Sequence, residues 1–477
     1  MTSRRTNPPL VLSEDRLFPA EPTARAVARR LYAAIAALPI VSPHGHTDPR
    51  WFAANENFAD PVELLVAPDH YLYRMLYSQG IALEALGIRA GDGQGAAADS
   101  RGAWRTFAAH YHLFRGTPSR LWLDYVFVKI FDLDVRLTSA TADLYFDRIL
   151  ERLARADYRP RELFDRFRIE VLATTESPLD DLRHHRQIRD SGWPGRVITT
   201  FRPDPVVDPE YEGFAENLSL LGETYAEDTT TWAGYLNALR HGRRLFATHG
   251  ATATDHGHPS AASADLDARA AAKLFEKVAR GEADAADSEL FRAQMLTEMA
   301  KMSLEDGLVM QIHPGSFRNH NRDLFRRYGR NRGADIPTAT DYVHALKPLL
   351  DRFGNERALT IIVFTLDETS YSRELAPLAG HYPALKLGPP WWFHDSPEGM
   401  RRFREQTTET AGFYNSVGFN DDTRAFLSIP ARHDVARRMD CAHLARLVAE
   451  HRLEEDEAHE LAHELAYGLV KRAYKLA

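Results

Sequence analysis

The stretch Leu359-Thr360-Ile361-Ile362-Val363-Phe364-Thr365 carries the clearest strand signal in this chain of 477 residues. Its β-branched and aromatic residues form a short apolar run that ends abruptly in polar residues, which is typical of a buried strand. Eight such runs occur along the chain, and the fourth is the weakest because it holds only small residues. They span residues 39–42, 169–173, 197–201, 251–254, 308–312, 360–365, 384–387 and 416–419.

Helical patterns lie between these runs, for example at residues 284–302 and 340–353. Strands that alternate with helices favour βα units and a mostly parallel sheet. Eight such units predict a (β/α)8 barrel of the TIM type. We therefore expect residues 1–477 to form a single barrel unit, although length alone would suggest about three domains.

Two long segments fall outside the repeating pattern. Residues 47–168 separate the first two runs and are rich in aromatic residues at helical spacing. Because long structureless loops are rare in compact domains, this segment predicts a helical insertion after the first strand. Within it, residues 91–100 are expected to form a flexible surface loop. The C-terminal segment 427–477 is predicted to be helical, with Leu461, Leu465 and Leu469 on one stripe.

Composition excludes several classes of protein. The 59 Lys and Arg against 67 Asp and Glu give a net charge of −8, which argues against nucleic-acid binding because that function favours a basic surface. No run approaches the length of about 18 apolar residues that a membrane-spanning helix needs, and residues 1–10 lack the apolar stretch of a signal peptide. The single cysteine, Cys441, excludes an internal disulfide framework and a thiolate metal cluster. A soluble cytoplasmic protein is expected.

Polar residues follow almost every predicted strand. The active site of a (β/α)8 barrel lies at the C-terminal ends of its strands, so these residues are the first candidates for chemistry. The ends read His44-Gly45-His46, Thr174-Thr175-Glu176, Arg202-Pro203-Asp204, Asp255-His256-Gly257-His258, His313-Pro314-Gly315, Asp367-Glu368, Trp391-Trp392 and Asp421-Asp422-Thr423-Arg424.

Composition alone predicts about 0.9 His-x-His matches, and three occur: His44/His46, His110/His112 and His256/His258. The second pair lies in the helical insertion, where positions i and i+2 do not share a face, so it is interpreted as structural. The first pair follows a strand, and an extended backbone would point both imidazoles the same way, towards one metal ion. The third pair is a weaker candidate, with a loop-capping role as its alternative.

The acids and arginines at the strand ends also have ordinary alternatives. Asp421 or Asp422 could complete a His/His/Asp metal site or act as a base, but acids also favour the N-cap of a following helix. Arg202 and Arg424 could clamp an anion, although a surface ion pair is the commoner role of an arginine.

The segment His459-Glu460-Leu461-Ala462-His463 fits the helical motif of zinc proteases, since histidines at i and i+4 share a helix face. The third ligand that usually follows downstream is missing, and the surrounding acids are typical of a solvated helix face. We therefore interpret this motif as a surface feature.

Taken together, these motifs resemble the uronate isomerases (glucuronate isomerases), an outlying family of the amidohydrolase superfamily. The resemblance covers nearly the whole chain and implies a distorted barrel with a helical insertion after the first strand. Its anchors are Ser42-Pro43-His44-Gly45-His46-Thr47-Asp48, Asp69-His70-Tyr71-Leu72-Tyr73-Arg74, Thr174-Thr175-Glu176-Ser177-Pro178-Leu179-Asp180, Phe201-Arg202-Pro203-Asp204, Asp255-His256, Gln311-Ile312-His313-Pro314-Gly315 with Arg318-Asn319, Trp391-Trp392-Phe393 and Asp422-Thr423-Arg424-Ala425-Phe426-Leu427.

The resemblance also implies roles for individual residues. His44 and His46 correspond to metal ligands of the first strand, and Asp422 to the acid of the eighth strand, which ligates the metal or its bound oxygen. Arg424 corresponds to the group that polarises the substrate aldehyde, and Tyr71 to the hydroxyl that shuttles protons.

For substrate binding, Arg202 corresponds to the anchor of the substrate carboxylate. His70, His313, Trp391 and Trp392 are expected to line the same site. Many relatives have Leu-Thr where this chain has Asn420-Asp421, so Asp421 competes with Asp422 for the acid role.

The implied activity is reversible aldose–ketose isomerisation of hexuronates at a mononuclear metal site, converting D-glucuronate to D-fructuronate and D-galacturonate to D-tagaturonate. One divalent metal is expected, with Zn²⁺ as the first candidate for a His/His/Asp site and Mn²⁺ as an alternative. The expected partner is the small-molecule hexuronate, without nucleic acid or membrane, and a homo-oligomer is left open.

Two alternatives remain at this point. A metal-dependent hydrolase would use a metal-activated water and usually a fuller ligand set. Dinuclear relatives bridge their metals with a carboxylated lysine, and no lysine follows a predicted mid-barrel strand. An inactive sugar-acid binder would have lost its metal residues, and none is lost.

Overall fold

The computed structural model describes residues 8–91 and 99–476. Seven of its strands form two parallel sheets. The first sheet has the order β1-β2-β3 and the second the order β4-β5-β8-β9, whereas β6 and β7 form a small antiparallel pair. The bounds are β1 (Ile40–Ser42), β2 (Ile169–Ala173), β3 (Arg196–Ile198), β4 (Ala253–His256), β5 (Val309–Ile312), β6 (Ser316–Phe317), β7 (Ile336–Pro337), β8 (Ile361–Val363) and β9 (Leu385–Leu387).

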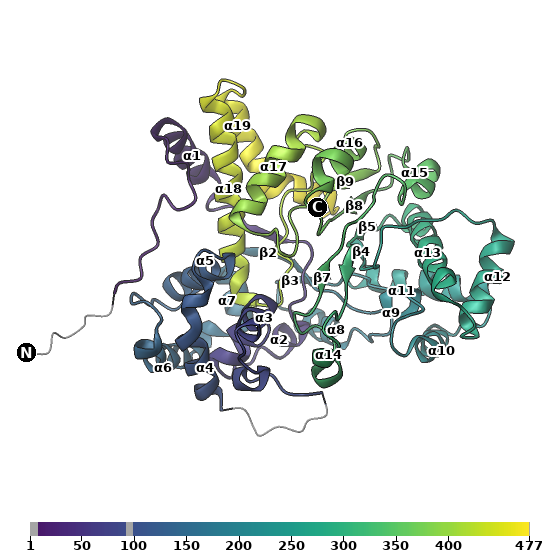
Figure 1. Cartoon of the computed structure of the whole chain (residues 1–477), viewed down its shortest axis with the longest axis horizontal. Coiled ribbons are helices and arrows are strands. Elements are labelled where there is room, and N and C mark those ends of the chain that lie inside the picture. Colours follow the sequence, from purple (N-terminus) through teal and green to yellow (C-terminus); the bar gives the residue numbers. More distant parts are fainter. Residues whose placement is uncertain (1–7, 92–98, 477) are drawn as a thin grey trace, which may run out of the picture.

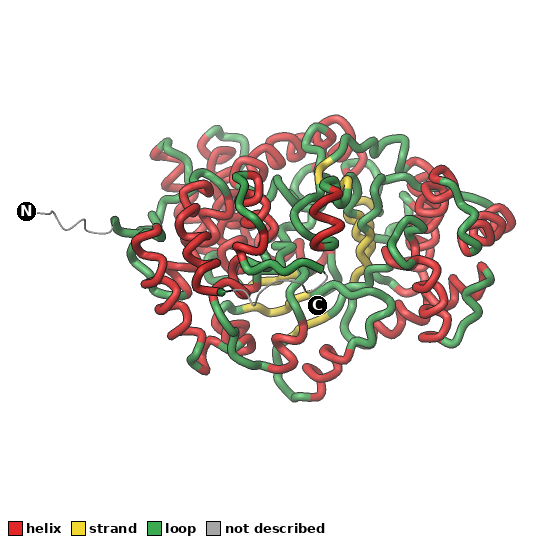
Figure 2. Tube along the Cα trace, turned by 60° about the horizontal axis from the view of Figure 1, so that its bottom comes forward, coloured by secondary structure: helices red, strands yellow, loops and turns green. Residues whose placement is uncertain are grey.

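Single bridges and one hydrogen bond join these sheets into a closed ring. Phe201, just beyond β3, bridges to Thr254 of β4. On the other side, Leu387 of β9 bridges to Ser416, and the amide of His46 donates to the carbonyl of Thr423 at 3.1 Å. The ring is therefore the predicted distorted (β/α)8 barrel, and Figure 2 shows its strands in the middle of the molecule among the helices.

Several predicted strands differ from the structure in their bounds. The third, predicted at residues 197–201, is regular only over Arg196–Ile198, and beyond it Phe201 forms isolated bridges. The fourth begins two residues late, at Ala253, and extends through Asp255 and His256. The eighth, predicted at residues 416–419, is not a regular strand, because only Ser416 pairs and Gly418 adopts a left-handed φ of 75°. The barrel closes through irregular backbone at this position.

Helices surround the barrel between its strands (Figure 1). The predicted helix at 284–302 is α13, but the one at 340–353 begins only at Lys347, since the carboxylates of Glu374 and Asp367 hold the amides of Tyr342 and Thr340 in a loop. The bounds are α8 (Arg183–Asp190), α9 (Asp204–Val207), α10 (Phe214–Tyr225), α11 (Trp232–Thr248), α12 (Ala268–Ala279), α13 (Ala285–Asp306), α14 (Arg322–Tyr328), α15 (Lys347–Phe353), α16 (Ala376–Ala379) and α17 (Pro397–Ala411).

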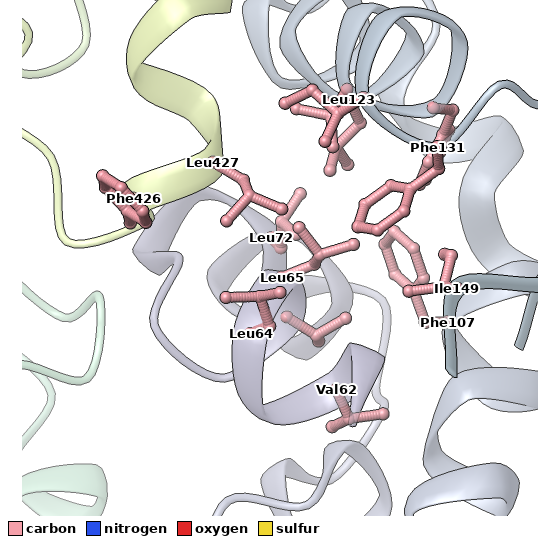
Figure 3. Close-up of a cluster of buried hydrophobic side chains, with 14 of the residues drawn as sticks. Val62, Leu64, Leu65, Leu72, Phe107, Leu123, Phe131, Ile149, Phe426 and Leu427 are labelled. Carbon is pink, nitrogen blue, oxygen red and sulfur yellow. The ribbon is translucent and has the colours of Figure 1, made fainter. Parts of the chain in front are cut away.

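The segment between β1 and β2 is helical, and most of the loop expected at 91–100 lies outside the described residues. Its buried side chains share one hydrophobic cluster with the segment that follows the barrel, as Figure 3 shows for Leu65, Phe107 and Leu427. Its helices are α2 (Pro49–Ala54), α3 (His70–Ser78), α4 (Ser100–His110), α5 (Pro118–Tyr125), α6 (Ala142–Leu153) and α7 (Pro160–Arg166).

The C-terminal segment is helical, in α18 (Ile429–Ala449), α19 (Glu455–His463) and α20 (Leu469–Ala473). The leucine stripe predicted from the sequence, Leu461, Leu465 and Leu469, is buried against α18 and against α1 (Pro22–Ile35). Within the described ranges, none of the helices combines the length and apolar character needed to cross a lipid bilayer.

Candidate active site

A cavity of about 350 Å³ lies among the segments that follow the barrel strands. Most of the predicted site residues line it: His46, His70, Tyr71, Arg202, Trp391, Trp392, Asp422 and Arg424. His44 and His313 are buried outside this lining, 1% and 2% exposed. Their rings stack with centroids 4.9 Å apart. His313 therefore contacts the site residue His44 but does not itself line the cavity.

The two histidines after β1 converge on Asp422. The Nε2 atoms of His44 and His46 lie 3.5 Å and 3.2 Å from Asp422 Oδ1. Together the three residues form a group whose ligand atoms all lie within 4.8 Å of one another, close enough to hold one metal ion. Imidazole and carboxylate donors in this number suit Zn²⁺ and related divalent ions.

Backbone geometry, not strand alternation, separates the two adjacent acids. Asp422 adopts a left-handed φ of 39°, which is uncommon for a residue other than glycine. This conformation lets its carboxylate face the histidines, while Asp421 Oδ2 lies 3.1 Å from Nε2 of His433 on α18. Strand alternation does not apply to these two residues, because regular pairing of the eighth segment is limited to Ser416.

A second group of possible metal ligands shares His44 with the first group. Asp255, in β4, lies with Oδ1 2.6 Å from Nδ1 of His313 and with Oδ2 2.9 Å from Nη1 of Arg202. Nε2 of His313 is buried without a hydrogen-bond partner among the described residues. His44, Asp255 and His313 form the other group that could hold a metal, so His44 belongs to both.

Burial and charge set the ionisation of these groups. Burial lowers the pKa of His46 to about 4, although the carboxylate of Asp422 opposes the shift. Burial alone would raise the pKa of Asp422, but His44 and His46 outweigh it and hold that pKa below its ordinary value. A neutral His46 beside an ionised Asp422 is a combination of protonation states that suits metal binding.

Arg202 is tied to two carboxylates. Its Nε donates to Asp204 Oδ2 at 2.8 Å, and its Nη1 pairs with Asp255. A Cβ at Gly257 would lie 2.2 Å from Nη2 of this guanidinium, so the glycine makes room for it. Arg202 lines the cavity, as expected for a carboxylate anchor, but its charge is already shared by two acids.

Arg424 and the aromatic residues form other parts of the cavity wall. Burial lowers the pKa of the Arg424 guanidinium, and no ion pair joins it to an acid among the described residues. His70 packs against Trp392 with ring centroids 5.7 Å apart, and Trp391 packs against His313 at 4.6 Å. A cation without a fixed counter-charge therefore faces the space beside Asp422.

The other histidine motifs do not form metal groups within the described chain. His256 contacts Thr254 Oγ1 through Nε2 at 3.0 Å, on the strand face opposite Asp255. His258 lines the cavity, and neither of its ring nitrogens has a hydrogen-bond partner among the described residues. In the C-terminal motif, His459 is half-buried and His463 is exposed on α19.

Several acids at the site have no role predicted from the sequence, among them Asp255, Glu176 and Asp395. Asp255 and Glu176 stood at predicted strand ends, which was a usable signal. Asp395 lies in the loop after Trp391 and Trp392, where no motif indicated it, yet it lines the cavity. Burial raises the pKa of Glu176 to about 8, so this cavity carboxyl is largely protonated at neutral pH.

A parallel barrel whose mouth brings together two histidines and an aspartate that could hold a metal ion belongs to the class of barrel enzymes. The model of the glucuronate isomerase family matches residues 21–474. The chain therefore belongs to the glucuronate isomerase family.

Individual relatives agree with this assignment. The uronate isomerase of Rhizorhabdus wittichii is 69% identical over 471 residues, which are 99% of this chain and 100% of the relative. The crystal structure of glucuronate isomerase from Caulobacter crescentus superposes with a TM-score of 0.97 at 62% identity and covers 98% of each chain. That of a uronate isomerase from Thermotoga maritima has a TM-score of 0.90 at 28% identity and covers 97% of this chain and 99% of its own.

Proposed function

We propose that this chain catalyses the reversible isomerisation of hexuronates, D-glucuronate to D-fructuronate and D-galacturonate to D-tagaturonate. The observation that carries the proposal is the convergence of His44, His46 and Asp422 at a cavity that Tyr71 and Arg424 also line. This set provides a metal group, a proton-transferring hydroxyl and a cation within one barrel mouth.

The reaction moves a proton from C2 to C1 through an enediol. The C2 proton is weakly acidic, so the C1 carbonyl must be polarised and the enediolate stabilised by nearby positive charge. Arg424 supplies such a charge from the cavity wall, and among the described residues no ion pair joins it to an acid. Asp422 and Tyr71 are the proton-transferring groups, and positioned groups of this kind accelerate reactions by about 10²–10⁴-fold.

The residues present fit a divalent metal, with Zn²⁺ as the first candidate. The Nε2 atoms of His44 and His46 and Oδ1 of Asp422 would hold it, because these atoms are clustered. The lowered pKa of His46 and the lowered pKa of Asp422 also favour metal binding. When bound, such an ion supplies positive charge that polarises a carbonyl oxygen.

The C6 carboxylate of the substrate needs a cation in the cavity. Arg202 is the proposed anchor, and its two carboxylate partners hold the guanidinium in one orientation. A fixed guanidinium loses little conformational entropy when it binds a carboxylate.

Hydrolysis is the less favoured alternative. Among the described residues no lysine lines the cavity, so a carboxylated-lysine bridge between two metals has no candidate there. The family match and the relatives named uronate isomerase also favour isomerisation.

The proposal is tested by incubating metal-loaded protein with D-glucuronate, and separately with D-galacturonate, in D₂O while NMR follows C1 and C2. Isomerisation predicts ketose signals and deuterium at the exchanging carbon. Metal-loaded protein that leaves both uronates unchanged would exclude the isomerase and favour a binder or a hydrolase.

A further inference from the structure

The Tyr71 hydroxyl, the candidate proton shuttle, has two fixed hydrogen-bond partners. It donates to Asp395 Oδ1 at 2.5 Å and accepts from the amide of Phe393 at 2.7 Å. Phe393, whose amide makes the second contact, adopts a left-handed φ of 70°. The loop that carries both partners is therefore shaped around the hydroxyl.

Counting lone pairs shows how the hydroxyl can meet a substrate. A tyrosine oxygen has one hydrogen to donate and two lone pairs to accept with. The hydrogen is committed to Asp395 and one lone pair to Phe393, so among the described groups one lone pair is left over. Tyr71 lines the cavity and is partly exposed, so a substrate hydroxyl can reach it only as a donor.

Asp395 is itself held in place. Its Oδ2 accepts from Nη1 of Arg432 at 2.7 Å, and the residue is only 9% exposed. Arg432 is fixed in turn by Ser428 Oγ at 3.2 Å and by the carbonyl of Asp421 at 3.3 Å, and it stacks over Trp122 at 3.7 Å. Asp395 therefore faces Tyr71 with one oxygen and a rigid cation with the other.

Burial favours a carboxyl group at Asp395 that can accept a proton. Burial raises the pKa of Asp395, and Arg432 opposes the shift, while Tyr71 donates to it. Asp69, at the N-terminus of α3, and Asp421 are the other acids that interact with Arg432, and Asp422 is the further acid that acts on Asp395. Proton affinity at Asp395 is thus higher than that of an exposed aspartate.

We propose that Asp395 is a positioning residue that works through Tyr71 in the isomerisation. It holds the phenolic hydrogen away from the cavity so that the tyrosine oxygen is presented to the substrate as an acceptor. When a substrate hydroxyl gives its proton to the Tyr71 oxygen, the original phenolic proton moves to Asp395. The bonding electrons stay on the substrate oxygen, Tyr71 remains neutral, and reversal restores both groups. The inference rests on the proposed isomerase function.

The chain contains a matched control. Tyr111 donates to Asp124 Oδ1 at 2.9 Å, and Arg120 donates to Asp124 Oδ2 at 2.7 Å, which repeats the Tyr–Asp–Arg arrangement in the helical insertion. These residues do not line the cavity. Asp124→Asn therefore reports the structural cost of removing such a carboxylate without a catalytic effect.

The test compares Asp395→Asn with Asp124→Asn in protein of equal metal content. Asparagine keeps an acceptor for the tyrosine but cannot take its proton. We expect kcat to fall about thirtyfold or more in Asp395→Asn, with KM within about threefold. The control should keep kcat within about twofold of wild type.

The decisive readout is the same substitution in a Tyr71→Phe background, because a residue that works through Tyr71 has little further effect once its hydroxyl is gone. A further loss of less than about twofold in kcat supports the inference; the full loss in that background, or wild-type kcat in Asp395→Asn, overturns it. If Asp395→Asn does not fold, Asp395→Glu is compared in the same two backgrounds by the same criterion. Wild-type protein inactive on both uronates would instead contradict the proposed function.

Discussion

Asp421 and Asp422 are adjacent acids with different surroundings. Asp421 is 2% exposed and pairs with His433 on α18. Asp422 faces the cavity and lies beside the Nε2 atoms of His44 and His46. Asp421 also borders the cavity, but its carboxylate is paired with α18 and anchors the irregular end of the barrel, whereas Asp422 is placed beside the two histidines.

Asparagine substitutions should separate these roles. We expect Asp422→Asn to lose about a thousandfold or more in kcat, because it removes a positioned proton-transfer group. Asp421→Asn should stay within about tenfold of wild type, at a cost of about 1 kcal/mol in unfolding free energy from a weakened hydrogen bond. The measurement is kcat for both variants after metal reloading. Comparable collapse in both variants, or the reverse ranking, would contradict this assignment.

At the residue scale, the sequence predicted those site residues that lie close together along the chain. His44 and His46 were predicted as candidate ligands because the two histidines lie two residues apart on one short segment beyond a strand. Asp395 was missed because its partners, Tyr71 and Arg432, lie on segments that are distant in the sequence. Only the folded structure brings these three side chains into contact. Asp255 stood at a predicted strand end, but its pairing with His313 was not readable from the sequence.

At the element scale, strands with β-branched runs were predictable and the barrel closure was not. The run at 359–365 contains β8. Its apolar, β-branched side chains Ile361, Ile362 and Val363 favour a buried strand, and all three are buried in the structure. The run at 416–419 has similar apolar residues, yet the left-handed Gly418 interrupts pairing after Ser416. A glycine's backbone conformation depends on tertiary packing, and the sequence alone does not fix it.

Pairing of the chain beyond β2 buries Glu176. The amide of Glu176 donates to the carbonyl of Thr200 at 3.1 Å, and its own carbonyl accepts from the amide of Arg202 at 2.9 Å. The ladder thus continues past the regular strand, and the Thr199 hydroxyl donates to the buried carboxyl. Burial is the main cause of the raised pKa of Glu176, and the hydrogen bond from Thr199 opposes it.

This burial predicts a pH-dependent stability. The unfolded carboxyl titrates near its ordinary value of 4.5 and the folded one near about 8, so between these values the folded state binds the extra proton. Rising pH therefore favours unfolding, by about 1.4 kcal/mol per pH unit. Relative to Glu176→Gln, wild type should lose stability from about pH 5 to about pH 8. Urea unfolding of both proteins at several pH values checks this, and a constant difference would exclude a raised pKa.

At the scale of the whole molecule, the candidate metal group spans the closure of the barrel. His44 and His46 follow the first strand, whereas Asp422 follows the last barrel segment. The hydrogen bond from His46 to Thr423 joins the same two segments through the backbone. An ion held by the three side chains would therefore connect parts of the chain that are nearly 380 residues apart and stabilise the ring as well as serve the chemistry.

Metal content and thermal stability should therefore change together. We expect about one tightly held divalent ion per chain, lost together with activity in a variant combining His44→Ala and His46→Ala. An ion that binds only the folded state stabilises it by about 2.7 kcal/mol at a hundredfold excess over Kd. A chelator should therefore lower the Tm of wild type, and the double variant should not respond to added Zn²⁺.

His459→Ala, in the C-terminal helical motif, is the control and should keep metal, Tm and activity. Elemental analysis and calorimetry of the three proteins test this. If the double variant keeps its full metal content while His459→Ala loses it, the metal is bound by α19 and not by the barrel mouth.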